Sequence, residues 1–572
     1  MRTCKHPVRS IFLTCALLCS FSAHAQTQPA AGESSPFSAN PQSTSVNDLI
    51  DRIISREHAE IVTIRRFNPI IETYIQDMKL DKKMGSVPAR DYYFLSQADL
   101  SPKGAETHSM LNRNRDGSDP LNPTSHQRSN FVPAYFADDF LQMIYIDPSG
   151  FDRQHYQFDY VRREFLGEVR CLVFDISPLP KSGKGRFKGR IWAEDQNLAI
   201  VRFNGVYLPV AGINGFNLHF DSWRLNVQPG LWLPAYIFSQ ESNQKDFLKN
   251  FLIDFLGGHV RFKSQTRLWN YSPRNVGRQE EFSELTVESP NTIEDQAVPQ
   301  NRSPVDARRE WQHQAEINVV DRLQRTGLLA PPGEVEKVLE TVVNNLEVTN
   351  NLDVKPDVQC RVMLTGTLDM FSIGHTIVLS RGLIDVLPDE ASLATMLAQE
   401  LADIILTKSS TDQWGFNDVT TFTAVEAMSH FSFKETPEQV RLATQKALEF
   451  LKNSPYKDKL GSVGLFLKQL DADSKTLTAL INPHLGNRVY LTSELMSSAP
   501  DLDPTKLDQI SALPMGARVK LDPWTNQVAL LKAKPTALLS ANEKMPLEVT
   551  PFMPFLTLYK NPGRTVSLPP PQ

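Results

Sequence analysis

Seven segments with the two-residue period of β-strands follow one another between residues 131 and 271, and no helical pattern separates them. Parallel strands need long crossover connections, which are usually helical, so this succession favours an antiparallel sheet. The residues Glu194-Asp195-Gln196-Asn197 are typical of a turn and predict a hairpin between the third and fourth segments. The seven predicted strands are 156–161, 169–174, 186–193, 198–203, 216–225, 231–238 and 260–271.

Helical spacing of apolar residues dominates on both sides of this region. Residues 47–74 predict one or two helices before the sheet, and residues 305–500 are mainly helical, with strands at 358–364 and 376–380. An acidic, Pro-containing segment marks the boundary between the two patterns. The fold class is therefore predicted to be α+β, with a curved antiparallel sheet domain, a mainly helical domain and a short β-rich tail. The predicted organisation is a signal peptide at 1–25, a flexible leader at 26–46, a helical lead-in plus sheet domain at 47–289, a linker at 290–304, the helical domain at 305–500 and the C-terminal extension at 501–572.

The first 25 residues have the three parts of a secretory signal peptide. Arg2, Lys5 and Arg9 give a basic start, a short apolar run follows, and Ala23-His24-Ala25 is a small-x-small cleavage pattern. The apolar run is too short to span a membrane, and no later stretch reaches spanning length. We therefore expect a soluble, exported protein, periplasmic or extracellular, with no transmembrane segment. Two cysteines, Cys171 and Cys360, remain after cleavage, and they either pair or are buried as free thiols.

The charge of the chain excludes a nucleic-acid coat, and it contains one concentrated basic run. The formal net charge is −5, so the strongly basic balance of nucleic-acid-binding proteins is absent and no nucleic-acid partner is expected. The basic run lies within ten residues that contain no acid. It is either the solvated face of a hairpin or a contact for anionic lipid headgroups or an acidic partner. Its members are Lys181, Lys184, Arg186, Lys188 and Arg190.

A helix predicted to begin at Pro388 carries polar side chains among apolar ones. Proline suits the first helical position, and Asp389 and Glu390 suit the dipole at a helix start. Gln399 and Asp403 are four residues apart and share a face, with Glu400 beside them. Buried polar groups are costly unless they have partners, so these three predict either an internal hydrogen-bonded cluster or a site.

The sequence from Ser380 through this helix resembles the active-site region of metallopeptidase family 48, the HtpX and CAAX-protease type of gluzincin. Ser380-Arg381-Gly382-Leu383-Ile384, Leu387-Pro388 and Leu393-Ala394 match the family pattern that leads into His-Glu-x-x-His, and Asn482-Pro483-His484 is similar to a later family motif. The resemblance covers about Gly333 to Pro500. It implies that residues 305–500 form a zincin-like metallopeptidase domain, for which zinc is the family cofactor.

The family's zinc ligands are replaced at the matching positions. Gln399 and Asp403 stand where the two histidines would be, and Leu442 aligns with the third ligand. Only Glu400, the general-base position, is kept, and without a metal-bound water it is expected to be catalytically silent. The resemblance therefore implies an inactive pseudopeptidase with no cofactor. The alternative is an active zinc metalloendopeptidase with substituted ligands, drawn from His375, His430 and His484.

The strand-rich half resembles the curved sheet of LolA-type lipoprotein carriers. The matching pieces are Gly189-Arg190-Ile191-Trp192, residues 199–203 and Trp232-Leu233-Pro234. The resemblance implies an apolar concavity that could hold a lipid. Candidates to line it are Phe187, Ile191, Leu198, Ile200, Phe203 and Trp223.

Together these patterns predict an exported envelope protein with a degenerate metallopeptidase domain. Its expected role is non-catalytic binding or scaffolding in envelope protein quality control, with envelope protein clients or lipids as partners. Two alternatives stay open, which are the active zinc peptidase and a lipid or lipoprotein carrier that works through the sheet.

Overall fold

The computed structural model describes the chain from residue 45 to residue 559 with gaps, and Val46–Gln572 form one compact unit. The predicted signal peptide and most of the predicted leader lie outside the described residues. No helix of the described part is long and apolar enough to span a membrane. The described residues are 45–81, 85–101, 106–111, 137–208, 218–241, 261–273, 303–406, 428, 431–489, 493–499, 513, 515–516, 518–531 and 547–559.

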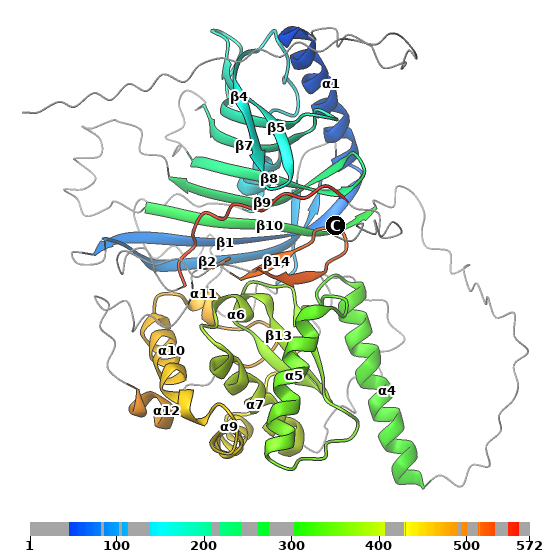
Figure 1. Ribbon diagram of the computed structural model, residues 1–572, viewed down its shortest axis with the longest axis vertical. Coiled ribbons are helices and arrows are strands. Elements are labelled where there is room, and N and C mark those ends of the chain that lie inside the picture. The colour runs from blue at the N-terminus through cyan, green and yellow to red at the C-terminus, as the bar shows by residue number, and fades with distance from the viewer. Residues whose placement is uncertain are drawn as a thin grey trace, which may run out of the picture. The chain divides into compact units, whose positions relative to one another are not determined.

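Ten strands form one curved sheet in the order β3-β2-β1-β10-β9-β8-β7-β6-β5-β4 (Figure 1). Every neighbouring pair is antiparallel, which confirms the predicted antiparallel sheet. All seven predicted strands are present, and β6 pairs with β7 across the predicted hairpin turn. The strands are β1 (Phe67–Asp81), β2 (Gly85–Asp99), β3 (Glu106–Ser109), β4 (Tyr156–Leu166), β5 (Val169–Pro178), β6 (Phe187–Glu194), β7 (Ile200–Tyr207), β8 (Leu218–Gln228), β9 (Leu231–Glu241) and β10 (Arg261–Pro273).

The predicted helical lead-in is only partly correct. Helix α1 (Val46–Ile64) is present, but the chain then enters β1 at Phe67 instead of continuing as helix. The polar side chains Glu72 and Gln76 of β1 are buried because both faces of this strand are covered. Their burial hides the alternation of polar and apolar residues by which an exposed strand is recognised.

One face of the sheet, the α1 face, is covered by helix α1 together with α2 (Ala137–Leu141) and the 3-10 turn η1 (Gln142–Ile144). Side chains of these elements and of the sheet form one apolar cluster. Five of the six residues predicted to line a concavity belong to this cluster, and Trp223 belongs to the cluster on the other face. All six are buried, so the space of the expected concavity is filled by the protein's own side chains. The five are Phe187, Ile191, Leu198, Ile200 and Phe203.

The other face of the sheet, the strap face, packs against the C-terminal residues and the helical half of the chain. Residues 551–559, which we name the strap, have no regular secondary structure. The amide of Glu168 donates to the Leu556 carbonyl at 2.8 Å, and the Tyr559 amide donates to Asn226 Oδ1 at 2.7 Å. Just before the strap, the buried side chain of Gln76 donates to the Leu547 carbonyl at 2.8 Å and accepts from the Val549 amide at 2.9 Å.

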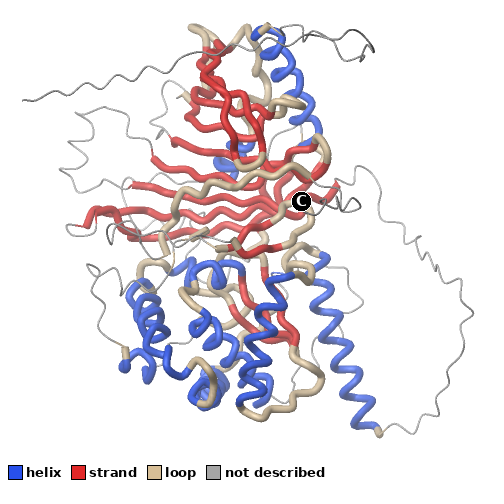
Figure 2. Tube along the Cα trace, in the orientation of Figure 1, coloured by secondary structure: helices blue, strands red, loops and turns tan. Residues whose placement is uncertain are grey.

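The helical half surrounds a three-stranded sheet of order β11-β13-β12 (Figure 2). Strand β11 is parallel to β13 and β12 is antiparallel to it. Glu72 of β1 forms a buried ion pair with Arg381 at 2.5 Å, which joins the large sheet to this half. The elements are α4 (Pro304–Arg325), α5 (Glu334–Thr349), β11 (Gln359–Met363), β12 (Met370–Ile373), β13 (Thr376–Ser380), α6 (Arg381–Val386), α7 (Glu390–Leu406), α9 (Pro437–Lys452), η4 (Lys457–Lys459), α10 (Leu460–Asp473), α11 (Thr478–Ile481) and α12 (Ser493–Ser498).

The predicted β-rich extension contains a short hairpin, β14 (Val519–Leu521) and β15 (Val528–Leu530). Both cysteines that remain after the predicted cleavage, Cys171 and Cys360, are free and buried. The pairing alternative is therefore wrong, and these thiols serve as small apolar core groups.

Candidate functional site

Helix α7 carries the polar residues that the sequence singles out. Its first turn is capped by Asp389, whose Oδ1 accepts from the Ser392 amide at 2.8 Å, so the helix begins just after the predicted Pro388. Glu400 and Asp403 are 2% and 4% exposed, whereas Gln399 is half-buried. The side chain of Ser372 in β12 donates to Asp403 Oδ2 at 3.1 Å.

Four carboxyl groups, that of Glu400 included, form a cluster on this helix and its neighbours. Glu435, in the segment that leads into α9, is hydrogen-bonded to Asp403. Burial raises the pKa of Glu435 to about 10, and this hydrogen bond and the charges of Asp403 and Glu400 add to the increase. Burial, with the charges of Asp403 and Asp369, raises the pKa of Glu400 well above its usual range. Oxygen Oε2 of Glu400 has no hydrogen-bond partner among the described residues.

Asp369 completes this carboxyl cluster from the loop before β12. It is fully buried, and its oxygens accept from the amides of Leu485 at 3.2 Å and Gly486 at 2.9 Å. Burial raises its pKa to about 7, although the two amides act in the opposite direction. Glu435 is therefore protonated at neutral pH, Asp369 is about half protonated, and the acid form of Glu400 is favoured. These groups are suited to neutral hydrogen bonding rather than to accepting a proton from water.

These residues do not fit a catalytic zinc ion, which needs imidazole, thiolate or carboxylate ligands converging on one point. Leu442 is 42% exposed on α9 and offers no donor atom. Nδ1 of His375 lies 3.6 Å from Glu316, and His484 stacks on Tyr93 with 5.4 Å between ring centres. His430 lies outside the described residues. Within the described part of the chain, no three His, Cys, Asp or Glu side chains are arranged to hold a metal ion.

Sequence reasoning missed two members of this cluster. Glu435 immediately precedes Thr436, and Thr436 forms a capping box with Gln439 at the start of α9. That capping signature could have located the helix start and the acid before it. Asp369 carries no such sequence signature, because its burial depends on contacts with Leu485 and Gly486, more than a hundred residues later.

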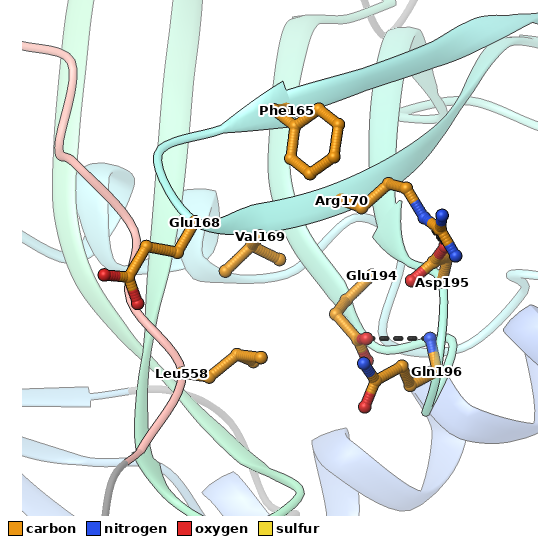
Figure 3. A pocket seen from close by; sticks show the side chains of 8 residues that line it. All are labelled: Phe165, Glu168, Val169, Arg170, Glu194, Asp195, Gln196 and Leu558. Carbon is orange, nitrogen blue, oxygen red and sulfur yellow. Dashed lines mark hydrogen bonds and ion pairs between the residues drawn. The ribbon is translucent and has the colours of Figure 1, made fainter. Parts of the chain in front are cut away.

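A second candidate site is an open cavity of about 320 Å³ on the sheet, between the turn that joins β4 to β5, the turn that joins β6 to β7, and the strap (Figure 3). Phe165, Val169 and Leu558 form its apolar part, and Phe165 is 66% exposed. The remaining lining side chains are polar or charged. They are Glu168, Arg170, Glu194, Asp195 and Gln196.

Ion pairing and turn formation fix the polar wall of this cavity. Arg170 is paired with Asp195, and these side chains lie together in Figure 3. Glu194 is buried and accepts from the amides of Gln196 at 2.7 Å and Asn197 at 2.8 Å, so it stabilises the turn before β7. The turn residues that predicted a hairpin therefore also form the rim of a cavity.

The strap approaches the β4–β5 turn at Gly167. This glycine has a φ of +68°, a conformation that other residues rarely adopt. A Cβ atom at this position would collide with the backbone of Leu556. Glycine is therefore required here for two independent reasons. The turn needs a positive φ, and the strap passes too close for a Cβ atom.

The five residues of the basic run do not behave alike. Arg186 is paired with Asp147, and Arg190 forms two hydrogen bonds with Asp175 at 2.7 and 3.0 Å. Lys181, Lys184 and Lys188 are exposed. Within the basic run, only these lysines can present their charge to a partner without first breaking an ion pair with a carboxylate of the protein.

Comparison with known proteins gives little further identification. No family model and no curated protein matches the chain. The solved structure of a LolA superfamily protein from Nitrosomonas europaea is similar over 40% of this chain and 94% of its own, with 11% identity and a TM-score of 0.19. A DUF1329 family protein from Desulfovibrio piger is similar over 41% of this chain and 94% of its own, with 10% identity and a TM-score of 0.18. The first name is that of the family which the strand-rich half resembles in sequence, but TM-scores this low carry no argument about fold or function.

Proposed function

We propose that the protein is an exported carrier that binds an acyl chain, of a lipid or of a lipid-modified protein, on the strap face of its sheet. The observation that carries this proposal is the 320 Å³ cavity beside the β4–β5 turn. Its size lies within the range of ligand pockets, roughly 300–1,000 Å³. Its wall joins apolar side chains to charged ones, which suits a ligand with an apolar chain and a polar end.

The strap is suited to act as a removable cover. Leu556 is fully buried on the sheet and Leu558 lines the cavity, so both occupy space that an acyl chain would take. Segments without regular structure that are held by few hydrogen bonds open more easily than a sheet does. The α1 face is less suited, because its apolar cluster is filled and Arg224 anchors α1 through a buried ion pair with Glu57.

A pair of glycine variants tests this proposal. Gly167 and Gly230 both have positive φ, but a Cβ at Gly230 meets nothing within 4 Å. Gly167→Ala should lift the strap, and Gly230→Ala should impose similar turn strain without touching it. We expect Gly167→Ala to bind the fluorescent fatty acid cis-parinaric acid several-fold more tightly than the wild-type protein and Gly230→Ala do. Equal affinity in all three proteins would reject the strap face as the ligand site.

Native mass spectrometry tests the carrier role itself. The protein, purified gently from an envelope fraction, should retain lipid-sized adducts that organic extraction removes. Recovery from that fraction, with an N-terminus at residue 26, would also establish the proposed export. A protein that is repeatedly free of adducts would count against a carrier.

A second candidate function is a non-catalytic scaffold in envelope protein quality control. The observation in its favour is helix α7, where Glu400 stands at the general-base position of the resembled family with a raised pKa, and the described residues contain no zinc ligand set. We expect no stoichiometric zinc by elemental analysis, no cleavage of unfolded outer-membrane proteins, and a client captured by cross-linking in the envelope. Stoichiometric zinc with chelator-sensitive cleavage would support the active peptidase instead.

A further inference from the structure

Arg267 of β10 is a buried cation at a small cavity on the strap face. Its side chain is 5% exposed, and its guanidinium carbon lies 5.4 Å from the centre of the Tyr236 ring. The cavity has a volume of about 20 Å³. Partly exposed Lys520 and Phe552 stand at its edge.

The guanidinium of Arg267 lacks acceptors. Its Nε and Nη2 atoms have no hydrogen-bond partner among the described residues. Arginine carries five N–H donors in a rigid, planar fork and cannot act as an acceptor. A buried charge that is neither paired nor hydrogen-bonded is strongly unfavourable, so these atoms require an acceptor from elsewhere.

The two nearest carboxylates are already engaged. Glu72 accepts from Arg381, from the Tyr93 hydroxyl at 2.7 Å and from the Gly366 amide. Asp385 accepts from three amides of the segment that leads into β14, those of Gly516, Arg518 and Val519.

Arg267 has charged neighbours of both signs. Burial, with the neighbouring charge of Arg381, lowers the pKa of Arg267 to about 10, although the charges of Asp385 and Glu72 act in the opposite direction, so the group remains charged at neutral pH. The side chain of Lys520 adds a second cation beside the cavity. This environment favours an anion over a neutral guest.

We propose that this cavity binds a small anion, a halide or a carboxylate group, at the guanidinium of Arg267. A volume of about 20 Å³ holds roughly one water-sized group. The cavity therefore accepts the charged group alone, and any tail attached to it would extend beneath Phe552 and Pro554 of the strap. The anion has two possible sources, which are a free ion and the carboxylate end of an acyl ligand. The proposal does not depend on the carrier function.

A water molecule is the competing occupant. Gln265 Oε1 also lacks a partner among the described residues, and a Cβ on Gly516 would lie 3.4 Å from this oxygen and 3.3 Å from Nη2 of Arg267. One water could therefore bridge the amide and the guanidinium. It would satisfy hydrogen bonds but would leave the charge of Arg267 uncompensated.

Thermal unfolding of the full chain distinguishes these occupants. Sodium chloride and sodium acetate are titrated against sodium methanesulfonate, whose tetrahedral sulfonate group is larger than a chloride ion or a carboxylate group, at constant ionic strength. The wild-type Tm should rise saturably with chloride or acetate, by about 2–4 °C near 100 times Kd. Arg267→Met should lose this rise. Arg202→Met should keep it, because Arg202 is a similarly shielded arginine that has its own carboxylate, Asp221, at 2.8 Å.

Decanoate identifies the source of the anion. If the carboxylate belongs to an acyl ligand, decanoate should act at a far lower concentration than acetate, again only when Arg267 is present. If a free ion is bound, the two should act alike. An equal rise in the wild-type protein and Arg267→Met, or no anion-specific rise in the wild-type protein, would overturn the proposal.

Bromide gives a direct reading that does not depend on the folding of any variant. Crystals of the wild-type protein grown in sodium bromide should show an anomalous peak within hydrogen-bond distance of the guanidinium of Arg267. Density for water without an anomalous signal would overturn the site.

Discussion

Glu57 and Arg224 form a two-pronged ion pair that is completely shielded from solvent. The distances are 2.6 Å from Nη1 to Oε2 and 2.7 Å from Nη2 to Oε1, and neither side chain has exposed surface. Arg224 also donates to the carbonyls of Ile200 at 3.2 Å and Ile144 at 3.3 Å. A single guanidinium therefore joins helix α1, two strands and the short helical segment on the α1 face.

Removing the charge of Glu57 should destabilise the α1 face. Glu57→Gln leaves Arg224 charged and buried without its carboxylate, a change that typically costs about 3–5 kcal/mol. Urea unfolding should therefore show a clearly lower midpoint. Glu449→Gln, which breaks the exposed Lys446–Glu449 pair, is the control and should change stability little. Equal midpoints for the two variants would show that the buried pair does not hold α1.

Hydrogen exchange should detect release of the strap in Gly167→Ala. The Glu168 amide loses the Leu556 carbonyl as its acceptor when the strap lifts, so its exchange should accelerate by about tenfold or more. Hydrogen exchange at the amides of residues 551–559 should accelerate as well. Gly230→Ala should leave both regions at the wild-type rate, and acceleration in both variants would point to general loosening of the sheet.

Stability should fall as pH rises from about 5 to 8. Burial raises the pKa of Asp369 to about 7, and the pKa values of Asp91 and Asp473 to about 6. Above pH 4 the unfolded chain releases these protons while the folded protein retains them, so rising pH stabilises the unfolded state relative to the folded state until the folded pKa is passed. Urea unfolding at several pH values measures this loss.

Asp369→Asn should flatten this pH dependence. Asparagine remains neutral at every pH, so the part of the loss between pH 5 and 8 that is due to Asp369, at most about 3 kcal/mol, should disappear. Asp353→Asn changes an exposed carboxylate and should keep the wild-type slope. An unchanged slope in Asp369→Asn would mean that this carboxyl is already ionised in the folded protein.

Glu400→Gln should be tolerated. Burial raises the pKa of Glu400 well above its usual range, so the amide replaces a group whose acid form is favoured and whose shape is nearly the same. Stability at pH 7 should stay within about 1 kcal/mol of wild type, whereas Glu400→Ala opens a cavity and should cost about 2–4 kcal/mol. Severe destabilisation by the glutamine would indicate a buried carboxylate that has an unrecognised partner.

The exposed lysines of the basic run should govern any contact with anionic lipid. The triple change Lys181→Gln, Lys184→Gln and Lys188→Gln should weaken co-sedimentation with phosphatidylglycerol vesicles and reduce its dependence on salt. Arg190→Gln should matter less, because Arg190 is already paired with Asp175. Identical sedimentation of all variants would assign the run to an ordinary solvated face.

The sequence predicts the sheet best where its strands are half-exposed. Strand β4 alternates visibly because it is the edge strand and much of it faces solvent. Strands β1 and β2 were missed because β1 carries Glu72 and Gln76 on covered faces, where partners far along the chain replace water. The register and existence of such strands depend on those distant partners.

Prediction of the candidate sites from the sequence is limited in the same way, because the sites also depend on residues that are distant in the chain. Gln399, Glu400 and Asp403 are visible as a spacing on one helix, but Glu435 and Asp369 join them only through tertiary contacts. The cavity rim is formed by a predicted turn, whereas its apolar wall needs Leu558 from the opposite end of the chain. Local patterns identify the elements, and packing between distant segments creates the sites.

The contact between Gln76 and Val549 links the order of synthesis to completion of the fold. Gln76 is buried, and the segment that satisfies its amide is made more than 470 residues later. Contacts this distant in sequence form late. A chain that ends before residue 547 would leave a polar amide unsatisfied within its largest sheet, so the stability of that sheet depends on residues 547–549.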